Sequence, residues 1–272
     1  MAVPVLRLEF MRRWILPLML LPSLPQATDA IAAEAPFKPP NLNPTQIPSA
    51  LVAEWGNYFV ATSVYGYANG TDPGPFTTDG SVNLGMGFGN ARQFVAVEVD
   101  YNQESLANGD NGGSVDVRLG RELLSRPDFN LHIGGGWLGV ASYGDWPKPG
   151  GSPYGVITAA WPLRPRNWAF RQTMQVNLGA GSGRFQRIDA VNLISDGVIA
   201  SVGVELTPNL GISTGWAGKG LNASLSYVPL RATPLYLSLS GANLTNVDGT
   251  GRAVALSLSW GGTFRTVTFP SR

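Results

Sequence analysis

The sequence predicts an all-β fold of about twelve antiparallel strands, and three observations support this prediction. From about residue 51 onward, hydrophobic residues alternate with small or polar ones, as on strands whose two faces meet different surroundings. No helical pattern of about ten or more residues interrupts this alternation. The connections between the expected strands are short and long in regular turn.

The composition narrows the class of protein. The chain has 272 residues, 34 glycines, one histidine and no cysteine, and only 14% of its residues are charged. Ordinary soluble domains carry about 25% charged residues. Beyond the N-terminus, no run approaches the roughly 20 apolar residues of a membrane-spanning helix. The formal net charge of +1 implies no general attraction to polyanions, so we expect no nucleic-acid partner.

The N-terminus has the three-part pattern of a secretory signal peptide. Arg12 and Arg13 precede an apolar run from Trp14 to Leu21, and small residues follow up to a cleavage site near Ala32. We therefore expect a signal peptide at 1–32, with translation starting at Met1 or at Met11. The five prolines of residues 33–50 predict a short Pro-rich periplasmic leader. A barrel at 51–264 and a C-terminal tail at 265–272 complete the expected organisation.

The alternation places the strands along the chain. In "RAVALSLSW" (252–260), Val254, Leu256, Leu258 and Trp260 share one face, and alanine and serine occupy the other. The same analysis predicts strands at 57–67, 81–89, 93–101, 114–120, 129–142, 154–161, 170–181, 197–206, 210–217, 221–227, 235–242 and 252–264. The alternation is blurred only in 57–67 and 154–161.

The connections indicate what the two faces touch. Short connections follow every second strand, at 90–92, 122–128, 163–169, 207–209 and 229–234, and long ones alternate with them. Only the connection at Gly218-Lys219 breaks this order. Short turns on one side and long loops on the other are typical of a transmembrane barrel, and a soluble sandwich has no reason to produce them. The sequence thus predicts a closed antiparallel transmembrane β-barrel, with lipid outside, a polar lumen inside and both termini in the periplasm. Aromatic residues near strand ends, among them Trp55, Tyr58, Phe59, Phe185 and Tyr227, are expected in the two interfacial girdles.

With these features the chain resembles a Gram-negative outer-membrane β-barrel protein. More narrowly, it resembles the poorly characterised barrels of cyanobacterial type, through "GFGNARQFVAVEVDY", "VNLGAGSGRF" and "GWAGKGLNASLSYVPLRATPLYLSLSGANLT". The resemblance covers roughly residues 55–264, and it implies an outer-membrane location and assembly by the barrel-assembly machinery. One departure is the C-terminus: such barrels usually end on an aromatic residue, whereas "RTVTFPSR" follows Phe264 here.

No motif predicts catalysis or a cofactor. The glycines of "GGGWLG" (134–139) match a dinucleotide fingerprint in spacing, but they lie inside a strand pattern and no helix follows them. His132 is the only histidine, and "GAGSGR" around Ser182 departs from the nucleophile elbow at two positions. We therefore expect no catalytic residue, cofactor or metal site, and a hydrogen-bonding place for His132 in the lumen.

The candidate functional residues are the polar side chains on the lumen face. Glu98 and Asp100 lie on a strand next to the one carrying Asp116 and Arg118, so ion pairs across the two strands are expected. The full lumen-lining set is Glu98, Asp100, Asp116, Arg118, His132, Arg171, Gln175, Asn177 and Glu205. These side chains either stiffen a filled interior or line a path for a small solute.

Several functions fit this sequence. The first is a narrow, porin-like pore or passive channel for small solutes or ions in the outer membrane. An alternative is a non-conducting structural, export-accessory or docking barrel. An outer-membrane lipid-modifying enzyme and a secreted β-sandwich binding module fit the residues less well. The sequence does not indicate the solute or the oligomeric state.

Overall fold

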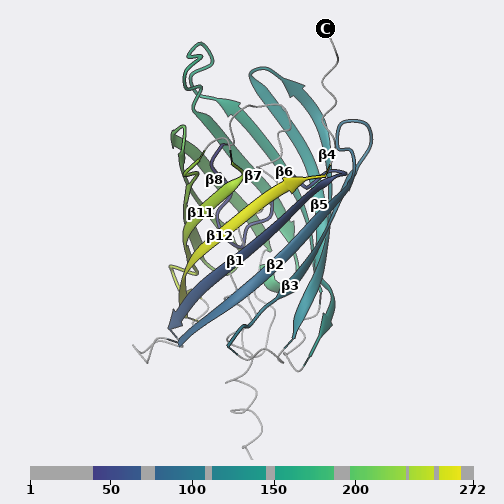
Figure 1. Cartoon of the computed structure of the whole chain (residues 1–272), viewed down its shortest axis with the longest axis vertical. Coiled ribbons are helices and arrows are strands. Elements are labelled where there is room, and N and C mark those ends of the chain that lie inside the picture. Colours follow the sequence, from purple (N-terminus) through teal and green to yellow (C-terminus); the bar gives the residue numbers. More distant parts are fainter. Residues whose placement is uncertain are drawn as a thin grey trace, which may run out of the picture.

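The chain folds into one closed barrel of twelve strands (Figure 1), in which each strand is antiparallel to its neighbours and β1 pairs with β12 to close the sheet. This computed structural model describes residues 39–68, 77–107, 112–144, 151–186, 197–230, 233–247 and 251–264. The predicted signal peptide and C-terminal tail lie outside these residues, and their boundaries stay predictions.

Each of the twelve predicted strands forms, but some bounds differ: residues 93–95 and 170–172 lie outside strands, and β4 runs to Arg126. Their bounds are β1 Asn57–Ala68, β2 Thr77–Gly89, β3 Ala96–Gln103, β4 Gly113–Arg126, β5 Phe129–Tyr143, β6 Ser152–Pro162, β7 Thr173–Gly181, β8 Val198–Thr207, β9 Leu210–Ala217, β10 Leu221–Tyr227, β11 Leu235–Ala242 and β12 Arg252–Thr263. The two blurred segments are the regular strands β1 and β6. A short 3-10 helix, η3 (Gly183–Phe185), follows β7. None of the helices in the described part of the chain is long and apolar enough to cross a membrane.

Alternation along each strand separates an apolar exterior from a small, polar interior. On β12, Val254, Leu256, Leu258 and Trp260 are exposed, and the residues between them are buried inside the barrel. The same division holds on β3, where Val99 and Tyr101 face outward. Exposed leucine and valine all around a closed sheet are expected in lipid and are unfavourable in water. The fold is therefore that of a transmembrane β-barrel.

The two ends of the barrel differ in most of their connections, with two exceptions: the β6–β7 connection (163–172) is long at the end where most are short, and the β9–β10 connection (218–220) is short at the other end. Asn57 of β1 lies opposite Thr263 of β12, so the barrel begins and ends at the same rim, which we call the short-turn end. The β4–β5 turn at this end is tighter than predicted. Because β4 pairs with β5 up to Arg126 opposite Phe129, only Pro127 and Asp128 remain in the turn rather than 122–128.

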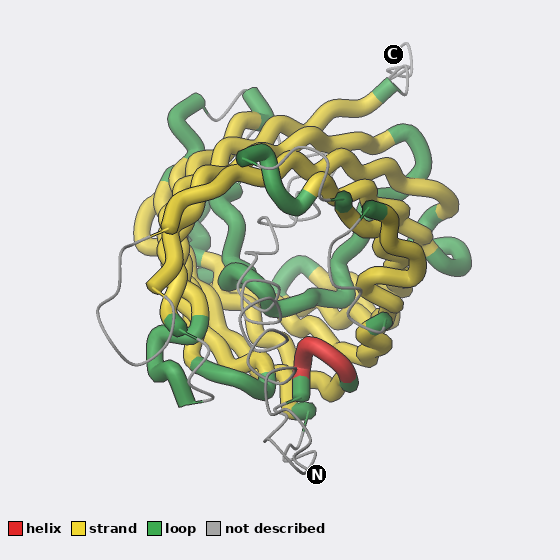
Figure 2. The backbone as a smooth tube through the Cα atoms, turned by 90° about the horizontal axis from the view of Figure 1, so that it is seen from below, coloured by secondary structure: helices red, strands yellow, loops and turns green. Residues whose placement is uncertain are grey.

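The interior holds a segment that the sequence places elsewhere. Residues 33–50 are predicted to be a periplasmic leader, but the described part of them, 39–50, is almost entirely buried and bonds inward-facing residues of the strands. Figure 2 shows loop segments that cross the interior of the barrel. We call residues 40–54 the inner segment. Its prolines suggest an exposed linker, whereas polar groups and glycines on the surrounding strands enclose it.

The inner segment runs as a loop inside the lumen. Asn41 lies beside Ser226 near the short-turn end of β10, and the chain then turns at 44–47, where the Ile47 N–H donates to the Pro44 carbonyl at 3.3 Å. It returns to the short-turn end, where the Trp55 N–H donates to the Gly89 carbonyl at 2.9 Å.

The aromatic residues divide between the two faces. Trp55, Tyr58, Tyr101 and Tyr227 are exposed on the exterior, as expected for girdle residues. Two predicted girdle residues face inward instead: Phe59 on β1 and Phe185 in η3 are buried. Phe59 faces inward because side chains alternate along β1 and its neighbours Tyr58 and Val60 occupy the outer face.

Candidate functional site

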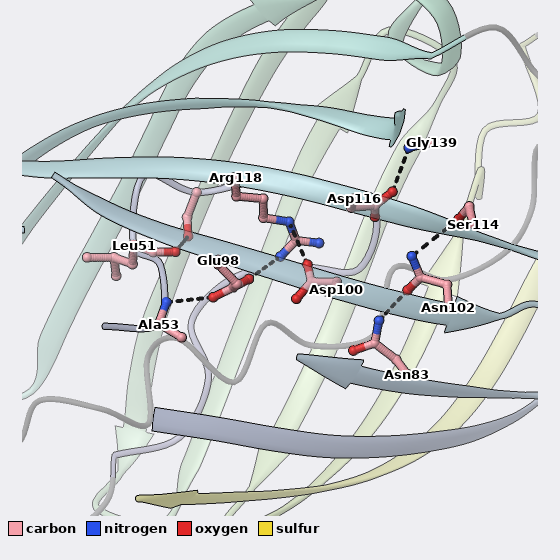
Figure 3. A network of polar contacts seen from close by, with 11 residues as sticks. Leu51, Ala53, Asn83, Glu98, Asp100, Asn102, Ser114, Asp116, Arg118 and Gly139 are labelled. Atoms are coloured by element: carbon pink, nitrogen blue, oxygen red, sulfur yellow. Dashed lines mark hydrogen bonds and ion pairs between the residues drawn. The ribbon is translucent and has the colours of Figure 1, made fainter. Parts of the chain in front are cut away.

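The most strongly charged part of the lumen is an ion-paired cluster on β3 and β4 (Figure 3). Arg118 of β4 donates from Nη1 to Glu98 Oε1 at 3.0 Å and lies 3.2 Å, Nε to Oδ2, from Asp100. Glu98 and Arg118 are directly opposed in the register, and all three side chains are buried. The ion pairs that the sequence predicts across these strands are therefore present. One guanidinium therefore contacts two buried carboxyl groups.

Asp116 belongs to a different contact. It lies opposite Asp100 in the register, yet its Oδ1 accepts the Gly139 N–H at 2.6 Å. The β4–β5 pairing shifts register at this point, between Val115 and Val117, and such bulges leave a backbone group unpaired. Asp116 thus closes a bulge and stiffens the wall.

Backbone hydrogen bonds to wall side chains hold the inner segment. Four of its N–H groups donate to wall oxygens: Asn41 to Ser226 Oγ at 3.0 Å, Thr45 to Ser224 Oγ at 2.9 Å, Ala50 to Thr158 Oγ1 at 2.7 Å and Ala53 to Glu98 Oε2 at 2.6 Å. In return, Asn222 Nδ2 donates to the Thr45 carbonyl at 3.1 Å. The contacts come from β3, β6 and β10, so they tie the segment to strands on several sides of the barrel.

Glycines on the inner face make room for this segment. Six of them, which we call the glycine track, lie against it: Gly87, Gly120, Gly134, Gly203, Gly211 and Gly215. A Cβ at Gly134 would lie 2.8 Å from Ala50 Cα, and one at Gly203 would collide with the Leu42 carbonyl. These glycines permit close approach of two backbones, and larger residues at the same positions would displace the segment.

An apolar cluster anchors the segment near its turn. Ile47 and Ala50 pack with buried residues from β5, β6, η3, β8 and β9, among them Tyr154, Phe185 and Ile199. Burying an isoleucine side chain contributes about 1.5–3 kcal/mol. Ile47 therefore anchors the middle of the inner segment, and Leu42 and Val52 are buried on either side of it.

A belt of serines runs across five neighbouring strands of the wall. Each of five neighbouring strands contributes one serine at directly opposed positions: Ser81, Ser63, Ser257, Ser238 and Ser226. All five are buried, and Ser63 Oγ and Ser81 Oγ are 2.8 Å apart. The hydroxyls of Ser238 and Ser257 have no hydrogen-bond partner among the described residues. Buried hydroxyls of this kind are groups that water or a hydroxylated solute can satisfy.

The other predicted lumen residues occupy several environments. Asn177 is buried on β7 and bonds Thr158 at 2.7 Å and Asn43 of the inner segment at 2.9 Å. Gln175 is buried on the same face, and Glu205 on β8 accepts the Thr173 N–H at 2.5 Å. His132 is half-buried on the inward face of β5, opposite Glu122 and Thr158.

Arg171 differs from the prediction. The sequence places it on the lumen face of a strand at 170–181, but β7 begins only at Thr173. Gln172 has a positive φ of 55°, which breaks the alternation, and the Arg171 guanidinium donates to the Pro127 carbonyl at the short-turn end. It is therefore separate from the Arg118 cluster.

The sequence predicts two of the residues that hold the inner segment, Glu98 and Asn177, and misses the others. Thr158, Asn222 and Ser224 carry no charge and look like ordinary lumen residues on their strands. A signal is present in the glycines, because six of them share inward parity with polar residues on five strands. No group of three or more histidine, cysteine, aspartate or glutamate side chains in the described ranges is arranged to hold a metal ion.

Comparison with known proteins gives likenesses in solved structures only. No family model matches the chain, and no curated protein matches it. The KdgM porin in complex with disordered oligogalacturonate aligns with a TM-score of 0.42 and 7% identity, over 74% of this chain and 98% of that one. The NanC porin aligns with a TM-score of 0.44 and 7% identity, over 74% and 98% of the two chains. An outer membrane channel from Pseudomonas putida F1 aligns with a TM-score of 0.40 and 10% identity, over 76% and 96%. At these values the likenesses carry no argument about function.

Proposed function

We propose that this chain is a passive channel for small polar solutes across the outer membrane. The proposal rests on one observation: the wall of the lumen and the chain that occupies the lumen are separate parts of the protein. The wall consists largely of glycine, serine and alanine, and a separate stretch of chain, the inner segment, fills the space beside it. Small barrels are filled by the side chains of their own walls. Because small residues line the wall and the inner segment occupies the space between them, a polar passage opens when the inner segment moves out.

The location follows from the exterior and from the N-terminus. A closed barrel with an apolar outer face needs a bilayer, and the predicted signal peptide directs export. Together they support the outer membrane of a Gram-negative cell, with insertion by the barrel-assembly machinery. The narrower resemblance to cyanobacterial barrels is part of this proposal, as is the absence of a catalytic role.

A non-conducting structural barrel is the second candidate. The observation that favours it is the near-complete burial of the inner segment together with the ion pairs of Arg118, which stiffen the wall. The two candidates predict different barrels after removal of the inner segment. A channel then contains an open passage, whereas a structural barrel stays closed to ions.

Planar-bilayer recordings distinguish them. We expect steady current above leak from a variant lacking residues 40–54, once its folding is confirmed by heat-dependent gel mobility. A folded variant that stays silent at all voltages would contradict the channel and support the structural barrel. Swelling of proteoliposomes in isotonic sugar solutions would then measure the size of solute admitted.

A further inference from the structure

We infer that the lumen wall is a binding track for a polypeptide without regular secondary structure, whose resident ligand is the inner segment of this same chain. The barrel conducts only while this ligand is out of the track, a clause that rests on the proposed function. The inner segment is then an intramolecular blocker held by a peptide-binding site.

The chemistry of the track is that of peptide recognition. The wall accepts backbone N–H groups at positions 41, 45, 50 and 53, all with side-chain oxygens. Asn222 adds a donor for one backbone carbonyl. Recognition through the backbone requires a ligand with free amides at these positions, and the buried side chains of Leu42, Ile47 and Val52 add apolar contacts.

The composition of the segment fits such a ligand. Pro40, Pro44 and Pro48 restrict the backbone before binding, so less conformational entropy is lost when the segment is held. Proline also lacks an N–H, which leaves fewer donors to satisfy inside the lumen. The glycine track supplies the matching shape on the wall.

The segment can leave without breaking the barrel. No residue of 40–54 belongs to a strand, and the ladders that close the sheet involve β1 to β12 alone. The hydrogen bonds between the segment and the wall involve wall side chains and a turn between strands. Release of the segment therefore breaks only its contacts with the wall and leaves every strand pair intact.

A reversible disulfide lock tests the inference on the full chain. The protein has no cysteine, so Ala50→Cys with Gly134→Cys introduces a single pair. A Cβ at position 134 would lie 3.1 Å from Ala50 Cβ, and about 3.8 Å is the mean in disulfides, so a small shift of the segment accommodates the bond. We expect brief openings of wild type in a planar bilayer and more frequent openings of the reduced variant, because a Cβ at position 134 lies 2.8 Å from Ala50 Cα and weakens the seating of the segment. Oxidation should lower their frequency at least about tenfold, and a reductant should restore it.

The matched control is a wall-to-wall pair. Ala242 and Ala253 are directly opposed on β11 and β12, so Ala242→Cys with Ala253→Cys joins two strands outside the glycine track and the serine belt. Oxidation of this pair should leave openings unchanged. Openings that persist in the fully oxidised Ala50/Gly134 variant would overturn the inference.

Substitutions in the track give a second test, which does not require wild-type openings. Gly203→Val drives a side chain into the Leu42 carbonyl and should raise the open frequency at least about tenfold. Gly155→Val is the control, since a Cβ there meets nothing within 4 Å. If the variant lacking 40–54 conducts while Gly203→Val and the lock both behave as wild type, the inference is wrong and the proposed channel stands. If the variant lacking 40–54 is folded and silent, the proposed function itself fails.

Binding of a separate peptide tests the track independently of conduction. A labelled peptide of sequence PNLNPTQIPSALVAE (residues 40–54) should bind the folded variant that lacks these residues, as measured by fluorescence anisotropy. The same peptide with proline at positions 45 and 53 loses two of the four donated N–H groups and should bind at least about tenfold more weakly. Equal binding of the two peptides, or none, would overturn the peptide track whether or not the barrel conducts.

Discussion

Arg118→Met should destabilise the barrel far more than the loss of an exposed arginine does. Arg118 contacts Glu98 at 3.0 Å and Asp100 at 3.2 Å, and both carboxylates are fully buried. Methionine fills similar space without charge, so the variant leaves two buried carboxylates with no cation. Removal of one partner from a buried ion pair costs about 3–5 kcal/mol.

Arg92→Met is the matched control at the short-turn end. Arg92 Nε lies 3.3 Å from Glu122 Oε2, but the arginine side chain is 70% exposed. Exposed pairs contribute about 0–1 kcal/mol. The two arginines thus make similar contacts at similar distances, and their expected effects differ because only one is buried.

Urea unfolding of both variants in phospholipid vesicles, followed by tryptophan fluorescence, measures the difference in free energy of unfolding. A triple variant, Glu98→Gln, Asp100→Asn and Arg118→Met, removes all three charges and keeps an acceptor for the Ala53 N–H. It should recover most of the loss. Equal effects of Arg118→Met and Arg92→Met, or a triple variant as unstable as Arg118→Met, would refute this account of the cluster.

Three further predictions concern the two faces of the wall. Leu256→Arg, in mid-strand on the lipid face, should cost about 2–4 kcal/mol in the same unfolding assay, whereas Leu206→Arg near the end of β8 should cost about 0–1 kcal/mol; equal costs would contradict the depth assigned to them. Asn177→Ala removes side-chain hydrogen bonds to Thr158, Asn43 and Ser201 and should cost about 1–3 kcal/mol, with no loss of stability as the contrary result. In the conducting barrel, Glu98→Gln with Asp100→Asn should weaken cation preference, measured as a smaller reversal potential in a KCl gradient, because acidic lumen side chains favour cations. An unchanged potential would assign both residues a structural role alone.

Local pattern was sufficient to predict the strands and their faces. On β12 the alternation of Leu256 with Ser257 decides which residue meets lipid, and neighbouring strands repeat it. The pairing of Glu98 with Arg118 was predictable for the same reason, since parity and strand order bring both to one face. The exceptions are local breaks in parity, such as the positive φ of Gln172, which removes Arg171 from the wall.

The inner segment could not be predicted in this way. Residues 40–54 have no hydrophobic period, and their prolines resemble those of an exposed linker. They are buried because of groups distributed over distant strands, such as Thr158 on β6, Ser224 on β10 and Gly203 on β8. Each of these residues fits an ordinary barrel by itself. Only the closed sheet brings them together around one path.

The central claim is that the wall encloses a polar passage which the inner segment fills, and thiol accessibility tests it most directly. Because the chain has no cysteine, Ser257→Cys and Leu256→Cys each introduce a single reporter, one on the lumen face and one on the lipid face. In vesicles, a charged, membrane-impermeant thiol reagent should modify position 257 rapidly in the barrel lacking residues 40–54 and at least about tenfold more slowly in the full chain. Position 256 should resist modification in both. Modification of position 256, or a position 257 that stays unreactive after the segment is removed, would contradict the claim.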